Sequence, residues 1–207
     1  MTPEERLERY AELAVKVGAN VQSGQEVVVL CLVEHAPVAR AVARQAYQAG
    51  ANRVIVQYGD QHVRRAAIEH GPVEALGVSP QYLLDWVTSW AVDRPAIIQL
   101  TGDPEPTLLS DLDSVLVQRS EATDQRRIYL PLVQQQAMNW VIVSAPTAGW
   151  AQAVFGEPDV ERLWDAVATA TRLDEADPVA AWRAHADKLK ARAVELTARG
   201  FDAVRFH

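Results

Sequence analysis

The sequence predicts an α/β fold: a mainly parallel open sheet flanked by helices, with a helical carboxyl-terminal portion. Three observations predict it. Four short apolar runs lack the alternation of a half-exposed strand, which indicates strands buried on both faces. Segments with apolar residues at helical spacing separate these runs. After Gly149 the helical spacing continues alone until the last seven residues.

The first elements alternate between helix and strand. Thr2, Pro3 and Glu5 have the arrangement of a capping box with proline at the first helical position, and an apolar stripe follows as far as Val17. After a glycine-bounded break, the valine-rich run EVVVLCLV predicts a strand at 26–33. A helix is expected at 37–49, since Gly50 is a typical residue just past a helix end, and RVIVQY then predicts a strand at 53–58.

The middle of the chain continues this alternation. Ser79 and Pro80 combine a cap with a proline, which predicts a helix start, and Pro131 is expected to kink or interrupt a later helix. Apolar spacing places these helices at 60–70, 79–90, 108–116 and 121–137. The runs PAIIQLTG and NWVIVSAP predict strands at 95–102 and 139–146.

The carboxyl-terminal part is expected to be two helices and the beginning of a strand. The helices start at Glu157–Pro158 and at Asp177–Pro178, and the second runs to about Gly200. Apolar residues of the second helix alternate by three and four, the spacing of a seam between packed helices: Val179, Trp182, Ala186, Leu189, Ala193 and Leu196. FDAVRFH (201–207) alternates like a strand, either an edge strand or the first strand of something absent. We interpret 1–207 as a single α/β domain with a helical extension at about 150–200.

Composition excludes several classes of protein. The only cysteine, Cys31, rules out a disulfide framework and a thiolate zinc cluster. A net charge of -7 disfavours a nucleic-acid-binding protein. No apolar run approaches the roughly 20 residues of a membrane span, and the charged start MTPEERLERY is unlike a signal peptide. The sequence therefore predicts a cytoplasmic protein that binds neither nucleic acid nor membrane.

Candidate functional residues follow the predicted strands, because ligands of open parallel sheets bind at the carboxyl ends of the strands. The polar residues expected there are Glu34, His35, Asp60, Thr101, Asp103, Ser144 and Thr147. Most of them are expected to cap helices or bind loop backbone. Glu34 and His35 could form an acid–base pair, but neighbours in an extended segment point to opposite sides.

No catalytic constellation can be drawn from spacing alone. The five histidines (His35, His62, His70, His185 and His207) lack the spacing of two ligands on one helix face. The loop 33–40 has no glycine to cradle a phosphate, and the acidic TGDPEP loop disfavours one. Cys31 lies inside a buried run and is expected to be inert. We expect no metal site and no catalytic residue in this chain.

Several segments together nevertheless resemble a known family. The segments span residues 7–29, 33–60, 139–156 and 163–196. In order and at these separations, they are similar to the amino-terminal half of the metal-dependent aminopeptidases of the aminopeptidase T / aminopeptidase II (aminopeptidase S) family.

The resemblance implies a metallopeptidase that removes N-terminal amino acids from peptides. It places two divalent ions, zinc or cobalt, and their ligands in a second half that this chain does not contain. The chain alone would then be an inactive scaffold and dimerisation domain, a homodimer that also contacts the missing catalytic domain. Glu34, His35, Asp60 and Thr147 are candidates for facing the substrate chamber.

Two other functions stay open. The chain could be a stand-alone, non-catalytic binding or dimerisation module in which FDAVRFH pairs as an edge strand. It could also be a small-ligand binding or isomerase-like α/β enzyme that uses Glu34 and His35 at the strand ends.

Overall fold

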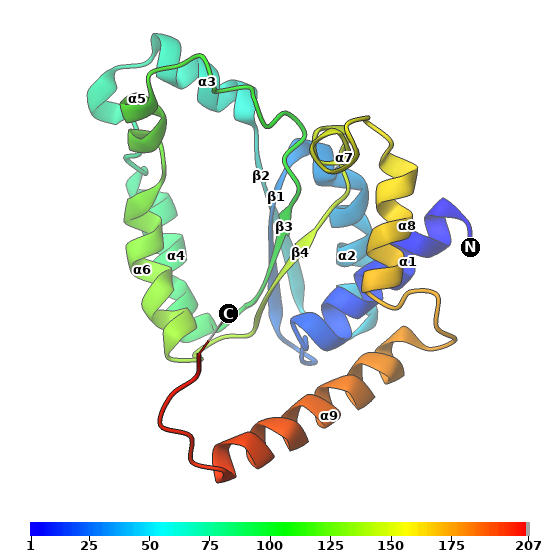
Figure 1. Cartoon of the computed structure of the whole chain (residues 1–207). Coiled ribbons are helices and arrows are strands. Elements are labelled where there is room, and N and C mark those ends of the chain that lie inside the picture. The colour runs from blue at the N-terminus through cyan, green and yellow to red at the C-terminus, as the bar shows by residue number, and fades with distance from the viewer. Residues whose placement is uncertain (206–207) are drawn as a thin grey trace.

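The computed structural model describes residues 1–205, and within them four strands form one parallel sheet (Figure 1). The strands are β1 (Glu26–Leu32), β2 (Arg53–Gly59), β3 (Ala96–Thr101) and β4 (Trp140–Ser144). Their order is β2-β1-β3-β4, so β2 and β4 are the edges. The predicted fold class and all four predicted strands in this part of the chain are confirmed.

The central strand β1 explains why the apolar runs do not alternate. Val27, Val28 and Val29 are all fully buried, because helices cover both faces of the sheet. In register, Val28 lies between Ile55 of β2 and Ile97 of β3. Burying each valine side chain contributes about 1.5 kcal/mol or more, so this strand anchors both layers.

One face of the sheet carries α1 (Pro3–Leu13), α2 (Ala36–Gln48) and α8 (Val160–Ala170). The predicted capping box of α1 is present: Thr2 Oγ1 accepts from the Glu5 backbone at 3.2 Å, and Glu5 Oε2 accepts from the Thr2 backbone at 2.7 Å. The ring of Tyr10 meets that of Trp164 edge to face at 5.5 Å, which joins α1 to α8. The first helix ends in a π-helical turn, η1 (Ala14–Gly18).

The other face carries α4 (Gln81–Asp93) and α6 (Thr123–Gln134), which pack on Val28 and Ile97. Val87 and Trp90 of α4 are buried there, and Pro131 lies inside α6 without ending it. The connecting elements are α3 (Gln61–His70), η3 (Val73–Ala75), α5 (Ser114–Arg119) and α7 (Ala148–Phe155). Helices on both faces of a parallel sheet make the fold a doubly wound one.

Helix α9 (Pro178–Ala198) follows α8 and runs away from the sheet (Figure 1). Only its first turns contact the body, through α1 and η1. His185 is half-buried, and its ring lies edge to face against Trp182 with the ring centroids 5.6 Å apart.

Three local predictions are wrong. Residues 105–112 form turns rather than the start of a helix, and α5 begins only where Asp113 Oδ1 accepts from the Val115 backbone at 2.8 Å. Helix α7 was not predicted, because Gly149 reads as a break although it lies inside the helix. Residues 201–205 are exposed and form no strand, and the last two residues of FDAVRFH lie outside the described residues.

Candidate functional site at the carboxyl ends of the strands

The sheet order creates an opening at the carboxyl ends of β1 and β3. The chain leaves β1 through η2 (Val33–His35) and α2 on one face, whereas it leaves β3 towards α5 and α6 on the other face. Where two neighbouring strands connect to opposite faces, their loops part and a ligand crevice can form. A hollow of about 320 Å³ lies there, lined in part by His35, Gln61, Gln99, Thr101 and Asp103.

His35 is a buried link between the ends of β1 and β3. Its side chain is only 1% exposed. Nδ1 accepts a hydrogen bond from the Leu32 backbone at 3.3 Å, and Nε2 donates to the Gly102 carbonyl at 2.8 Å. This is the bonding of a neutral imidazole with its proton on Nε2. Because both ring nitrogens bind backbone, His35 positions a loop in this structure and leaves no nitrogen free for a substrate.

Glu34 diverges from His35, as expected, although the segment is a 3-10 turn and not extended. Its side chain is exposed while that of His35 is buried. The pair therefore offers no concerted acid–base chemistry.

Thr147 binds a second carbonyl in the loop after β3, the one that follows the Gly102 carbonyl bound by His35. Its hydroxyl donates to the Asp103 carbonyl at 2.9 Å and accepts from the Trp150 backbone at 3.3 Å, which caps α7. Gly102 has φ +117°, and a Cβ there would lie 2.2 Å from the Ala145 carbonyl oxygen. The loop after β3 is thus fixed between the ends of β1 and β4.

Three carboxylates lie near His62 of α3, those of Glu34, Asp60 and Glu105, and we call them the acidic rim. Asp60 Oδ1 caps α3 by accepting from the backbone of His62 at 2.8 Å. The His62 ring lies 2.8 Å from Glu105 Oε1. This hydrogen bond raises the pKa of His62, and the nearby charges of Asp60 and Glu34 raise it further. The acidic rim is therefore a region of negative charge that favours the protonated form of His62.

Two further hollows adjoin the first. One of about 420 Å³ lies beside α3 and shares Leu32 and Gln61 with it. Another of about 230 Å³ lies towards β4 and shares Leu30 and Gln99. The sequence analysis did not predict Gln61 or Gln99 at this site. A polar residue such as Gln99 inside the apolar run AIIQLT could have indicated it.

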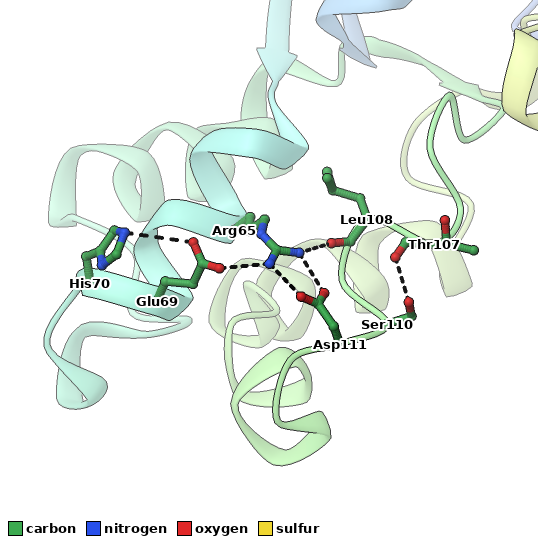
Figure 2. Close-up of polar contacts among 7 residues, drawn as sticks. All are labelled: Arg65, Glu69, His70, Thr107, Leu108, Ser110 and Asp111. Atoms are coloured by element: carbon green, nitrogen blue, oxygen red, sulfur yellow. Dashed lines mark hydrogen bonds and ion pairs between the residues drawn. The ribbon is translucent and has the colours of Figure 1, made fainter.

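Arg65 of α3 ties the loop 105–112 to this end of the molecule (Figure 2). Its guanidinium pairs with both carboxylate oxygens of Asp111 at 2.7 Å, donates to the Leu108 carbonyl, and lies 2.8 Å from Glu69. The Arg65 hydrogen bonds lower the pKa of Asp111 to about 2. The loop is therefore held beside α3 by a charged, bidentate contact.

The described residues do not supply a metal centre. Within residues 1–205, no three His, Cys, Asp or Glu side chains gather as a ligand set. Cys31 is 8% exposed, and burial raises the pKa of its thiol to about 11, so it is not a thiolate nucleophile at neutral pH. In the same part of the chain no helix combines the length and apolar character needed to cross a membrane.

Comparison with known proteins gives consistent matches. The family described as thermophilic metalloprotease (M29) matches residues 3–207. Aminopeptidase 2 of Geobacillus stearothermophilus is 36% identical over 192 residues, which cover 90% of this chain and 46% of that protein. Aminopeptidase T of Thermus thermophilus is 36% identical over 206 residues, which cover 97% of this chain and 50% of that protein.

The same likeness extends to three dimensions. The solved structure titled wild-type AmpT from Thermus thermophilus matches with a TM-score of 0.80 and 34% identity, over 95% of this chain and 49% of that one. The chain thus spans about half the length of the curated relatives it matches.

Proposed function

Because the chain belongs to the thermophilic metalloprotease (M29) family, we propose that it is the amino-terminal scaffold domain of a metal-dependent aminopeptidase. The observation that carries the proposal is the extent of the match: nearly all of this chain corresponds to about half of relatives named aminopeptidases. On this proposal a second half holds two divalent ions, zinc or cobalt, which activate water. The enzyme acts on peptides as a cytoplasmic homodimer.

The residues of this chain contribute by shaping one side of the substrate chamber. On this proposal Glu34 and Asp60 face it, whereas the buried His35 and Thr147 support the loop beside it. His35 and Thr147 fix the loop after β3 through consecutive carbonyls, those of Gly102 and Asp103. The acidic rim attracts the protonated amino terminus of a peptide, since a region of one charge raises the local concentration of ligands of the other.

Peptidase assays test the proposal directly. The purified chain, incubated with zinc or cobalt and leucine p-nitroanilide, should release no nitroaniline. Adding a fragment of the Thermus thermophilus aminopeptidase T that comprises its unmatched half should restore metal-dependent release. Metal-dependent turnover by this chain alone would contradict the proposal, because the described residues contain no cluster of ligands.

A second function, a stand-alone dimerisation module, is favoured by the edge strand β4. Trp140 is 48% exposed and Ile142 is 54% exposed on this strand, an apolar edge that could pair across a two-fold axis. Light scattering of the purified chain tests this contact, because both proposed functions include a dimer. A dimer that the substitution Trp140→Lys converts to monomer would assign the contact to β4, whereas a monomer of 22.8 kDa would exclude the stand-alone module.

A further inference from the structure

Helix α9 leaves the body of the molecule through a short connection that is unlike a flexible linker. Residues 171–177 (TRLDEAD) join α8 to α9 and contain no glycine. In the middle of this connection the side chain of Leu173 is fully buried in the core, and its backbone N–H donates to the Ala168 carbonyl at 2.9 Å. A hinge needs loop residues that are free to change φ and ψ, so this connection is poorly suited to bending.

The side chain of Trp182 attaches the second turn of α9 to the end of α8. Its ring is half-buried against the core, and its indole Nε1 donates to the Thr171 carbonyl at 2.7 Å. The Arg172 guanidinium lies 6.0 Å from the centroid of the same ring, and the His185 ring meets it edge to face. Cation–π and edge-to-face contacts both depend on orientation. The indole ring is therefore held by residues before α9 as well as by α9 itself.

A second attachment lies immediately before α9. The Arg9 guanidinium of α1 donates to the Glu175 carbonyl and, at 3.2 Å, to the Ala176 carbonyl. Asp177 Oδ1 then caps α9 by accepting from a backbone N–H three residues later at 2.9 Å. A single attachment would leave α9 free to pivot. Two attachments, separated along the chain by more than one helical turn of about 5.4 Å, define a direction.

The length of α9 makes its direction important. A helix of 21 residues is about 30 Å long, so a bend of about 20° at its start moves its far end by about 10 Å. From Asp187 to Ala198 every residue is exposed, and Figure 1 shows this half extending past the edge of the sheet. Within residues 1–205 the orientation of the exposed half therefore comes from the contacts at the start of the helix.

We propose that residues 171–182, which we call the joint, fix the direction of α9 relative to the sheet, and that Trp182 is the positioning residue of this joint. Helix α9 is then a rigid arm and not a flexible connection. If the second half of the proposed aminopeptidase follows this arm, the joint sets where that half lies relative to the loop after β3. That consequence rests on the proposed function, whereas the fixed direction of α9 does not.

Distances between spin labels test the proposal with the full chain. Labels are attached to the exposed positions Arg40→Cys of α2 and Val194→Cys of α9; the native Cys31 is buried, which raises the pKa of its thiol to about 11 and slows its labelling. Pulsed electron paramagnetic resonance should give one narrow distribution of distances. Trp182→Ala should broaden this distribution and shift its mean by up to about 10 Å. Trp182→Phe keeps an aromatic ring but cannot donate to the Thr171 carbonyl, so it should broaden the distribution less.

A second pair of labels separates the direction of α9 from the integrity of the fold. Arg40→Cys and Thr88→Cys lie on helices that cover opposite faces of the sheet, and the distance between them should stay narrow in Trp182→Ala. Trp140→Ala removes an exposed tryptophan from β4 and should leave both distances unchanged.

Three results would overturn the proposal. The first is a broad distribution between α2 and α9 in the unsubstituted chain. The second is a narrow, unshifted distribution in both Trp182 variants. The third is broadening for both pairs of labels, because Trp182 would then support the whole fold and not the direction of α9. None of these measurements needs peptidase activity, so a negative result leaves the proposed function to be decided by the nitroanilide assay.

Discussion

Replacing His35 tests whether this residue serves to stabilise the fold at the carboxyl ends of the strands. His35→Ala removes two hydrogen bonds, to the Leu32 backbone and the Gly102 carbonyl, and empties a site that is 1% exposed. Each hydrogen bond contributes about 1 kcal/mol, and truncating a large buried side chain adds about 2 kcal/mol or more through the cavity. We expect the free energy of unfolding to fall by about 4 kcal/mol.

Two further variants make the measurement specific. His35→Asn keeps an acceptor near the position of Nδ1 but cannot reach Gly102, so we expect about half of that loss. Glu34→Ala changes the adjacent, exposed residue and should alter stability by less than about 0.5 kcal/mol. Urea denaturation followed by circular dichroism gives all three values, provided that the slope with denaturant is unchanged.

A loss below about 1 kcal/mol for His35→Ala would refute the reasoning, because two part-buried backbone groups would lose their partner and the buried ring would leave a cavity. An equal loss for Glu34→Ala would refute it as well, since the effect would then not come from the buried ring.

Three other predictions concern the same end of the molecule. Gly149→Ala should destabilise the chain by about 2 kcal/mol in urea denaturation, although alanine favours helices, because its Cβ would lie 2.1 Å from the Pro104 carbonyl oxygen. NMR titration should give His62 a pKa above 6.5, and Glu105→Gln should lower this pKa. The contact between His62 and Glu105 stabilises the fold fully below pH 6.5, and this stabilisation is lost as the pH rises through the raised pKa of His62. Asp111, with its pKa lowered to about 2, contributes stability that is present above pH 3.8 and lost towards pH 2, so Asp111→Asn should flatten the acid side of the melting-temperature profile.

The strands and helix starts could be predicted because their causes are local. Val27 to Val29 form an uninterrupted apolar run only because both faces of β1 are covered. The cap residues Thr2 and Asp60 bond backbone two or three positions away, within reach of sequence reasoning. Each of these elements is as predicted.

The failures have tertiary causes. Glycine is typical of a helix break, but Gly149 lies inside α7, where only a residue without a side chain fits against the Pro104 backbone. This contact joins segments 45 residues apart in the sequence. The same holds for the site. Strand-end positions placed His35 and Thr147 correctly at one end of the sheet, yet that both bind the loop after β3 depends on β1 and β4 flanking it. Gln61 and Gln99 meet only because α3 and β3 lie beside the same hollow.

The edge-to-face contact of Tyr10 with Trp164 has a consequence for synthesis on the ribosome. Each strand after β2 joins an edge that already exists, since β3 pairs with β1 and β4 with β3. The sheet can therefore grow in the order in which the chain emerges. Helix α8 cannot cover α1 in the same stepwise way. Its residues Trp164 and Glu161, which contact Tyr10 and Arg6, are made more than 150 residues after these partners. The nascent chain consequently carries an uncovered apolar face on its first helix until Glu161 and Trp164 have been made, and holding chaperones bind surfaces of this kind.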